Sequence, residues 1–344
     1  MRFRALPNLD PYPRVAARES GVLARVARGS ALIGGALMLI ATVPRPVAAA
    51  RVEANASRAD RSPQERALAG GVVHLRAPAS RMILILRSTF AMGSSPTDVL
   101  DAAADCAREP LGQSCQERFF SVELPQHRVT LSSYWLDRTE VTVEDYGRCV
   151  ALRRCRSVRF AEGARRFDSP RYPVSLVTYE DAETYCRFRR ARLPTEAEFE
   201  RAARGGEGRR FPWGEVYNSR AANHGRLGWS TTDDVDGYVE LAPVGALPAG
   251  RTPDGFLDLA GNVAEWVSDR YAPGYPEGDA VDPTGPATAA AASERVVRGG
   301  HFSSAAPWLR GAARSSAEPS ARAPYLGFRC ARSAERRREA RKSD

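Results

Sequence analysis

The sequence has little lysine, no C-x-x-C pair of cysteines, no internal repeat and no long apolar run. Lys342 is the only lysine among the 344 residues, and the uncharged apolar stretch at positions 30–43 has only 14 residues. A helix needs about 20 apolar residues to span a bilayer, so this stretch is too short to do so alone. The missing C-x-x-C pairs argue against a structural zinc site. With 43% hydrophobic and 26% charged residues, the chain is neither disordered nor collagen-like, and it allows one large domain or two small ones.

The positive charge of the chain is concentrated at its two ends. The formal net charge is +9, of which residues 1–50 carry +5 and residues 332–344 carry +3. The body, residues 51–331, therefore carries only +1. A nucleic-acid-binding domain needs a basic surface, so we expect no nucleic-acid partner.

The first 50 residues have the pattern of a secretory signal. Arg25 and Arg28 precede the apolar stretch, and the small residues Ala48–Ala50 follow it. This order predicts cleavage after about Ala50 and export to the periplasm or the extracellular space. An uncleaved membrane anchor is the alternative, and it is the only membrane contact that we expect. We expect a linker over 51–80, one domain over 81–332 and a charged tail over 333–344.

The local patterns predict an irregular α+β domain. Runs at 82–86 and 127–137 indicate strands, and the segment 90–96 is expected to end the first of them. Polar segment 97–118 is expected to be a surface excursion closed by a local disulfide. Three helices are expected to begin after Thr142, Thr178 and Thr195, with a capping box at the first and the third, and the third is expected to stop at Gly205. Residues 205–330 are rich in turn formers, so we expect turns and short strands there.

The cysteines lie outside the predicted signal, and their number is even. An even count in an exported chain favours disulfides, for which 15 pairings of six cysteines are open. The six are Cys106, Cys115, Cys149, Cys155, Cys186 and Cys330.

A series of short motifs resembles one known family. In chain order they begin at Phe90 (FAMGS), Glu123 (ELPQHRV), Arg138 (RTEVT), Tyr185 (YC), Arg192 (RLPTEAEFE), Phe211 (FPWG), Gly261 (GNVAEWV), Arg298 (RGG) and Gly327 (GFRC). Together they resemble the sulfatase-modifying-factor family, that of the formylglycine-generating enzyme. The resemblance implies a C-type-lectin-like fold with little regular secondary structure.

The resemblance places a copper site after the RGG motif, but this chain lacks its ligands. Catalytic members of the family bind Cu(I) through two cysteines, and the matching positions here are Ser304 and Leu309. A hydroxyl and an alkyl group are poor ligands for Cu(I), which prefers soft thiolates. We therefore expect no copper and no copper-dependent formylglycine synthesis.

Other chemistry near the RGG motif has thin support in the sequence. His301 and Ser304 are close enough in sequence for a histidine-activated serine to be drawn, although no acid partner is evident. An iron site would require two of His127, His224 and His301 to converge with a carboxylate. Trp308 is expected at the mouth of the pocket, where it could contact a ligand.

The resemblance also implies two calcium sites, whose oxygen donors suit a hard cation. One would use the side chains of Asn223 and Asp236 with the carbonyl groups of His224 and Tyr238. The other would use the side chains of Asp258 and Glu265 with the carbonyl groups of Gly261 and Val263. Asp258 stands where the human-type enzyme has Asn. Asx turns without a cation are the alternative for both segments.

The same resemblance implies a disulfide between Cys186 and Cys330. The local pairs Cys149–Cys155 and Cys106–Cys115 then remain. The favoured hypothesis is an exported, calcium-stabilised binding or accessory domain for a peptide or saccharide ligand. The alternative is an oxidoreductase of the same family that uses other residues near His301.

Overall fold

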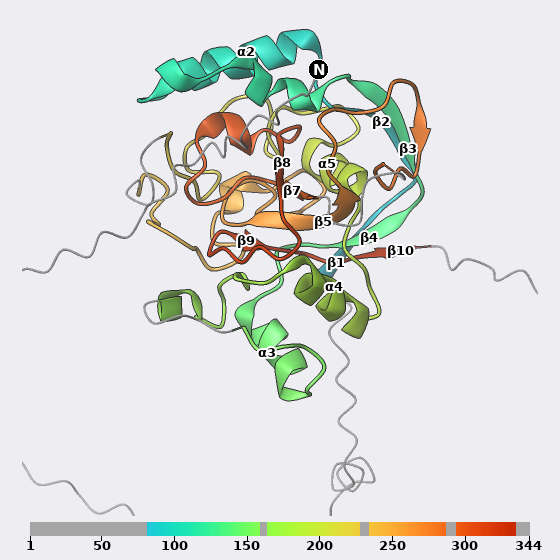
Figure 1. Ribbon diagram of the computed structural model, residues 1–344, viewed down its shortest axis with the longest axis vertical. Helices are drawn as coiled ribbons and strands as arrows, with labels where there is room; N and C mark the ends of the chain where they lie inside the picture. Colours follow the sequence, from blue (N-terminus) through green and yellow to red (C-terminus); the bar gives the residue numbers. More distant parts are fainter. Residues whose placement is uncertain (1–80, 159–163, 228–233, 287–293, 335–344) are drawn as a thin grey trace, which may run out of the picture. The chain divides into compact units, whose positions relative to one another are not determined.

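The computed structural model describes residues 81–158, 164–227, 234–286 and 294–334 (Figure 1). The predicted signal at 1–50, the linker at 51–80 and the tail from residue 335 onward lie outside the described residues. Within the described ranges, no helix combines the length and apolarity that a membrane span requires.

Three small sheets form the framework, and each joins segments that are distant in sequence. The first has the order β1 (Met82–Ile85), β4 (Tyr134–Asp137), β10 (Ala331–Ser333), all antiparallel. The second has the order β2 (Ser88–Met92), β3 (His127–Leu131), β6 (Ala280–Val281). The third has the order β8 (Arg314–Ala317), β7 (Arg295–Arg298), β5 (Ala264–Arg270), β9 (Leu326–Gly327). The chain therefore closes on itself, because β10 pairs with β4 and β4 pairs with β1.

Four α-helices are described: α2 (Pro96–Ala107), α3 (Val143–Ala151), α4 (Tyr179–Phe188) and α5 (Glu196–Arg204). In Figure 1, α2 lies at one end of the domain, α3 and α4 lie toward the other, and α5 lies between them. Thr142, Thr178 and Thr195 are the N-caps of α3, α4 and α5, as the sequence predicted. Their hydroxyl groups accept from backbone N–H groups that have no partner inside the helix.

The caps differ from the prediction at two helices, since α3 lacks the expected capping box and α4 has one that was not predicted. The capping box is complete at α4 and α5, but at α3 the Asp145 carboxylate contacts Arg81 and Arg148 instead of the N-cap backbone. Gly205 ends α5 with a φ of +69°, a conformation that glycine adopts without strain.

Three local expectations were wrong. The segment expected to end the first strand contains most of β2, and residues 127–137 form two strands, β3 and β4. The supposed polar excursion begins with α2, which has a capping box between Ser95 and Asp98. The helix buries Val99, Ala102 and Cys106, whose spacing of three and four is the helical signal that the polar composition obscured.

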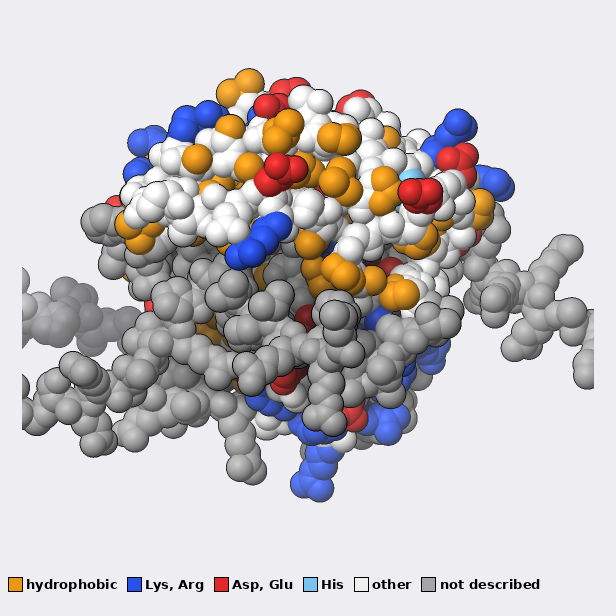
Figure 2. All heavy atoms as spheres, turned by 45° about the horizontal axis from the view of Figure 1, so that its top comes forward, with side chains coloured by type: hydrophobic (Ala, Val, Ile, Leu, Met, Phe, Trp, Pro, Cys, Tyr) orange, Lys and Arg blue, Asp and Glu red, His pale blue; other side chains and the backbone are white. Residues whose placement is uncertain are grey.

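One face of the domain carries α2, and Figure 2 shows hydrophobic side chains spread over it between isolated charges. Leu100 on α2 and Leu111 after it are exposed. Beneath α2, Phe120 and Trp308 belong to the cluster that the buried side of the helix covers.

The three predicted disulfides are confirmed: Cys106–Cys115, Cys149–Cys155 and Cys186–Cys330. They use all six cysteines of the chain, so no thiol is free. The third bridge joins α4 to the segment before β10 across 144 residues, whereas the second spans only 6.

We predict that the long-range disulfide contributes most to stability. In the chain-entropy model, removing Cys186–Cys330 with two serines lowers the free energy of unfolding by about 5 kcal/mol, and removing Cys149–Cys155 lowers it by about 2 kcal/mol. Urea unfolding of the two double variants beside the unmodified protein measures the difference. Equal losses would contradict the prediction.

Candidate functional site

The RGG motif forms a tight turn at the end of β7. Gly299 and Gly300 have φ values of +91° and +67°. A Cβ atom on Gly300 would lie 2.9 Å from the carbonyl oxygen of Trp308, and 3.4 Å from both Ser304 Cβ and Leu309 Cδ2. The two positions that match the copper cysteines therefore converge beside Gly300.

The surroundings of these two residues are unsuited to copper. Leu309 is fully buried and packs in an apolar cluster with Phe211, Ala222 and Ala260. Ser304 is 1% exposed, and its Oγ accepts from the backbone N–H of His301 at 3.0 Å. Since every cysteine is in a disulfide, the chain has no thiolate to offer Cu(I) here.

His301 is buried between aromatic and hydroxyl groups. Its ring stacks on Tyr325 with centroids 4.4 Å apart, and its Nδ1 lies 3.0 Å from the Oγ of Ser303. Burial lowers the pKa of His301 to about 3, so the imidazole is neutral at physiological pH. The sequence considered Ser304 as the hydroxyl partner and missed Ser303.

His127 and His224, the other two histidines of the iron hypothesis, contact different residues. The ring of His127 packs against that of Tyr275 at a tilt of 52°, with centroids 5.0 Å apart, and His224 is hydrogen-bonded through Nε2 to the hydroxyl group of Tyr217. Across the described ranges, no three His, Cys, Asp or Glu side chains converge closely enough to hold a metal ion by themselves. The iron hypothesis therefore gains no support.

Trp308 is half-buried and packs under α2. Its ring centroid lies 5.3 Å from that of Phe120. The guanidinium group of Arg310 lies over the Phe120 ring, 5.1 Å from the ring centroid. The predicted ligand contact of Trp308 remains a prediction.

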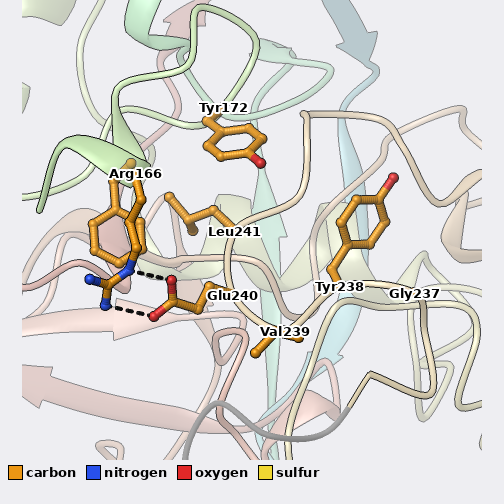
Figure 3. A pocket seen from close by; sticks show the side chains of 8 residues that line it. Arg166, Tyr172, Gly237, Tyr238, Val239, Glu240 and Leu241 are labelled. Carbon is orange, nitrogen blue, oxygen red and sulfur yellow. Dashed lines mark hydrogen bonds and ion pairs between the residues drawn. The ribbon is translucent and has the colours of Figure 1, made fainter. Parts of the chain in front are cut away.

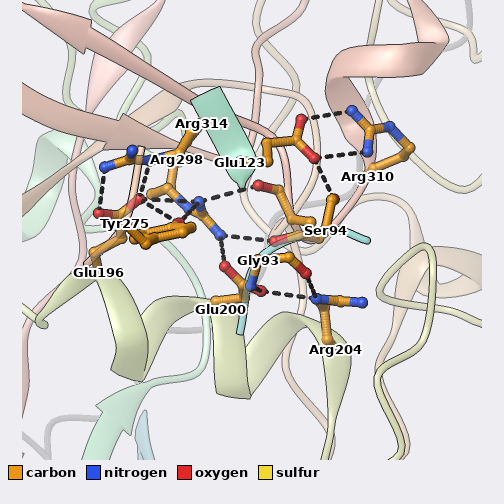
Figure 4. Close-up of polar contacts among 12 residues, drawn as sticks. Gly93, Ser94, Glu123, Glu196, Glu200, Arg204, Tyr275, Arg298, Arg310 and Arg314 are labelled. Carbon is orange, nitrogen blue, oxygen red and sulfur yellow. Dashed lines mark hydrogen bonds and ion pairs between the residues drawn. The ribbon is translucent and has the colours of Figure 1, made fainter. Parts of the chain in front are cut away.

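A buried cluster of charges holds the RGG turn to α5 (Figure 4). Arg298 donates to Glu200 at 2.7 Å and to Glu196 at 3.1 Å. Arg314 on β8 makes two hydrogen bonds to Glu196 at 2.7 and 2.8 Å. Burial alone would raise the pKa of Glu200, but Arg298 and Arg204 outweigh it and the pKa is lowered.

The same cluster reaches the segment between β2 and α2. Glu200 accepts from the backbone N–H of Gly93, and Arg204 donates to the Gly93 carbonyl group at 2.7 Å. Nearby, Arg310 makes two hydrogen bonds to Glu123, which also accepts from the Ser94 hydroxyl group. Four of the motifs that carried the resemblance, FAMGS, ELPQHRV, RLPTEAEFE and RGG, thus meet in this buried region.

The structure brings together the residues predicted for the first calcium site. Asp236 accepts from the backbone N–H groups of His224 and Tyr238, each at 2.8 Å. Asn223 is 1% exposed and donates through Nδ2, whereas its Oδ1 has no hydrogen-bond partner among the described residues. A buried amide oxygen without a donor is a free ligand atom for a cation.

In the second predicted site, both carboxylates accept hydrogen bonds from within the chain. Asp258 accepts from the backbone N–H of Gly245 at 2.6 Å. Both oxygens of Glu265 are held by Arg329, at distances of 2.7–3.0 Å. Glu140, which the sequence did not single out as a site residue, lies beside Asp258. It sits in the RTEVT motif, and nothing in that motif indicates that its carboxylate is buried.

A pocket of about 290 Å³ lies next to the first predicted calcium site (Figure 3). Its lining includes the aromatic rings of Phe167, Tyr172 and Tyr238, together with the ion pair of Arg166 and Glu240. Beneath it, Phe167 and Leu241 pack against Phe302 of the segment that follows the RGG turn. The residues that line the pocket therefore connect the loop of the first predicted calcium site to the segment that follows the RGG turn.

Comparisons with known proteins agree on one family. The family model described as "Sulfatase-modifying factor enzyme 1-like domain" matches residues 72–334. A formylglycine-generating enzyme from Streptomyces coelicolor is 43% identical over 190 residues, which are 52% of this chain and 58% of that protein. The "Inactive C-alpha-formylglycine-generating enzyme 2" of Mus musculus is 36% identical over 174 residues, 48% of this chain and 51% of that protein. The chain thus spans little more than half the length of these curated relatives.

A solved structure agrees with the fold. PvdO from Pseudomonas aeruginosa has a TM-score of 0.58 and 26% sequence identity, over 73% of this chain and 94% of PvdO. The C-type-lectin-like α+β fold implied by the motifs is confirmed.

We predict that Arg298→Met lowers the free energy of unfolding far more than a matched substitution at an exposed arginine. The variant leaves Glu196 and Glu200 buried with one partner fewer, which costs about 3–5 kcal/mol. Arg187→Met removes the exposed ion pair to Glu183 on α4 and costs about 0.5 kcal/mol or less. Denaturant unfolding measures the free energy of unfolding of both variants. If Arg298→Met lowers it as little as Arg187→Met does, the buried charge cluster does not hold the RGG turn to α5.

Proposed function

The chain belongs to the family of sulfatase-modifying factor enzyme 1-like domains, and on that premise we propose that it is a binding or accessory domain. In this proposal it is exported, is stabilised by calcium, and does not make formylglycine by the copper-dependent route. It binds a peptide or saccharide ligand through its irregular loops.

One observation carries the proposal: a packed leucine side chain occupies one of the two positions that match the copper-binding cysteines of the family. Leu309 fills the apolar cluster, Ser304 offers only a hydroxyl group, and every cysteine is in a disulfide. These residues do not fit Cu(I), so no step through copper is assigned to this chain.

Calcium fits better than copper because the donors are hard oxygen atoms. Asn223 and Asp236 would hold one ion with the carbonyl groups of His224 and Tyr238, and the free Oδ1 of Asn223 supports this set. The side chains of Asp258 and Glu265, with the carbonyl groups of Gly261 and Val263, would hold a second ion. Each ion would tie its loop together and supply no chemistry.

The pocket beside the first calcium site is the proposed place for the ligand. Tyr172, Tyr238 and Phe167 offer aromatic surface, and the Arg166–Glu240 pair offers both hydrogen-bond donors and acceptors. Such a mixture suits a polar ring or a peptide segment. The three disulfides support export, since they persist in oxidising compartments.

The test is to measure copper binding and oxidation on the full chain. We expect no aldehyde on a cysteine-containing peptide, no oxygen consumption and no Cu(I) binding in competition with a colorimetric chelator. The matched variant Ser304→Cys/Leu309→Cys supplies two thiols beside Gly300 and is expected to gain Cu(I) binding. Aldehyde formed by the unmodified chain would refute the proposal.

A further inference from the structure

The sheet of β1, β4 and β10 directs alternate rows of side chains toward the core and away from it. Residues paired across antiparallel strands lie on the same face, and the next residue along each strand lies on the other face. The row that faces the hydrophobic core consists of Ile83, Leu136 and Ala331. The next row, Leu84, Trp135 and Arg332, therefore points away from the core.

This outer row is open to solvent. Leu84 is 38% exposed, and Leu86, two positions further along the chain, is 69% exposed. Trp135 is partly exposed and belongs to none of the hydrophobic clusters formed by the described residues. Helix α4 reaches only the other end of this face, where Arg189 at its C-cap donates to Asp137 (Figure 1). Leu84, Leu86 and Trp135 thus form an apolar patch, here called the sheet patch.

The charges around the sheet patch are positive. Arg87 and Arg332 are exposed, and neither forms an ion pair with a described residue. Asp137 is the only carboxylate on the three strands, and Arg189 neutralises it. An apolar patch with unpaired arginines at its margin favours a partner that is anionic at its surface and apolar beneath.

The segments that flank the domain connect to it through the same sheet. The sheet order places β1 and β10 at its two edges. β1 follows the expected linker 51–80, and β10 ends at Ser333, directly before the charged tail. Residues 332–344 carry a net charge of +3, so the tail adds positive charge to the edge that carries Arg332.

We infer that the sheet patch docks the folded domain onto the surface of an anionic phospholipid bilayer. Leucine and tryptophan side chains insert into the headgroup region, and arginines bind the lipid phosphate groups. This contact is separate from an N-terminal anchor and from the proposed ligand pocket. A second copy of the chain is the less favoured occupant, because pairing along β1 would bring two positively charged surfaces together.

Hydrogen–deuterium exchange of the full chain with lipid vesicles tests the inference. Vesicles of phosphatidylcholine and phosphatidylglycerol are expected to slow exchange of the backbone amides at residues 82–86 and 134–137. Vesicles of phosphatidylcholine alone are expected to leave exchange there unchanged. The apolar stretch at 30–43 can bring the chain to either kind of vesicle, but it does not cover the sheet patch selectively on the anionic one.

Variants of exposed residues measure the two parts of the contact by cosedimentation with the anionic vesicles. Leu84→Gln/Leu86→Gln is expected to lower the affinity about 10-fold, because two apolar side chains no longer enter the bilayer. Arg332→Gln removes one charge and is expected to lower it about fivefold. The matched control Leu111→Gln/Val216→Gln changes side chains that are 44% and 80% exposed outside this sheet, and it leaves the affinity unchanged.

The other outcomes overturn the inference and leave the proposed ligand pocket standing. Vesicle binding without slower exchange at residues 82–86 means that a flanking segment alone binds lipid. Slower exchange there that depends on protein concentration and not on vesicles means that a second copy covers the sheet patch. Absence of binding to the anionic vesicles also refutes the inference. If circular dichroism shows that the leucine double variant does not fold, the exchange of the unmodified chain decides.

Discussion

The interaction on which the rest depends is the buried pairing of Arg298 with Glu196 and Glu200. It fastens the RGG turn to α5, and through Glu200 and Arg204 it fastens both to the backbone of Gly93. Such a network is costly to bury, so it is stable only when every member has its partner. In a domain with little regular secondary structure, these bonds give the loops a defined position. The turn that presents Ser304 and Leu309 is therefore held in place whether or not those residues perform chemistry.

This separation of scaffold and site explains how a member of the family can retain the fold without the copper ligands. Leu309 adds apolar volume to a cluster that already contains Phe211 and Ala260, so the position contributes to packing. The loops predicted to bind calcium are fixed independently, through Asn223, Asn262 and their backbone contacts. Fold and function are thus encoded by different residues, and only the site residues decide the chemistry.

Capped helices, the disulfide pairing and the fold were predictable from the sequence because their signals are local or belong to ordered motifs. Thr195 and Glu198 stand at the fixed spacing of a capping box, and the Cys186–Cys330 pairing followed from the resemblance. Helix α2 was missed because its alanine-rich, acidic sequence hides a narrow apolar face. The pairing of Glu265 with Arg329 was not predictable, since it joins residues that lie 64 positions apart in the chain. Partners so far apart are set by tertiary packing, which residue spacing does not reveal.

The most direct measurement of the central claim is the elemental content of the full chain, purified without added metal and analysed by inductively coupled plasma mass spectrometry. A domain that has exchanged copper chemistry for a calcium-stabilised binding role should contain calcium in amounts comparable to the protein, with copper and iron at background. Copper or iron at one equivalent per chain, with calcium absent, would contradict the account.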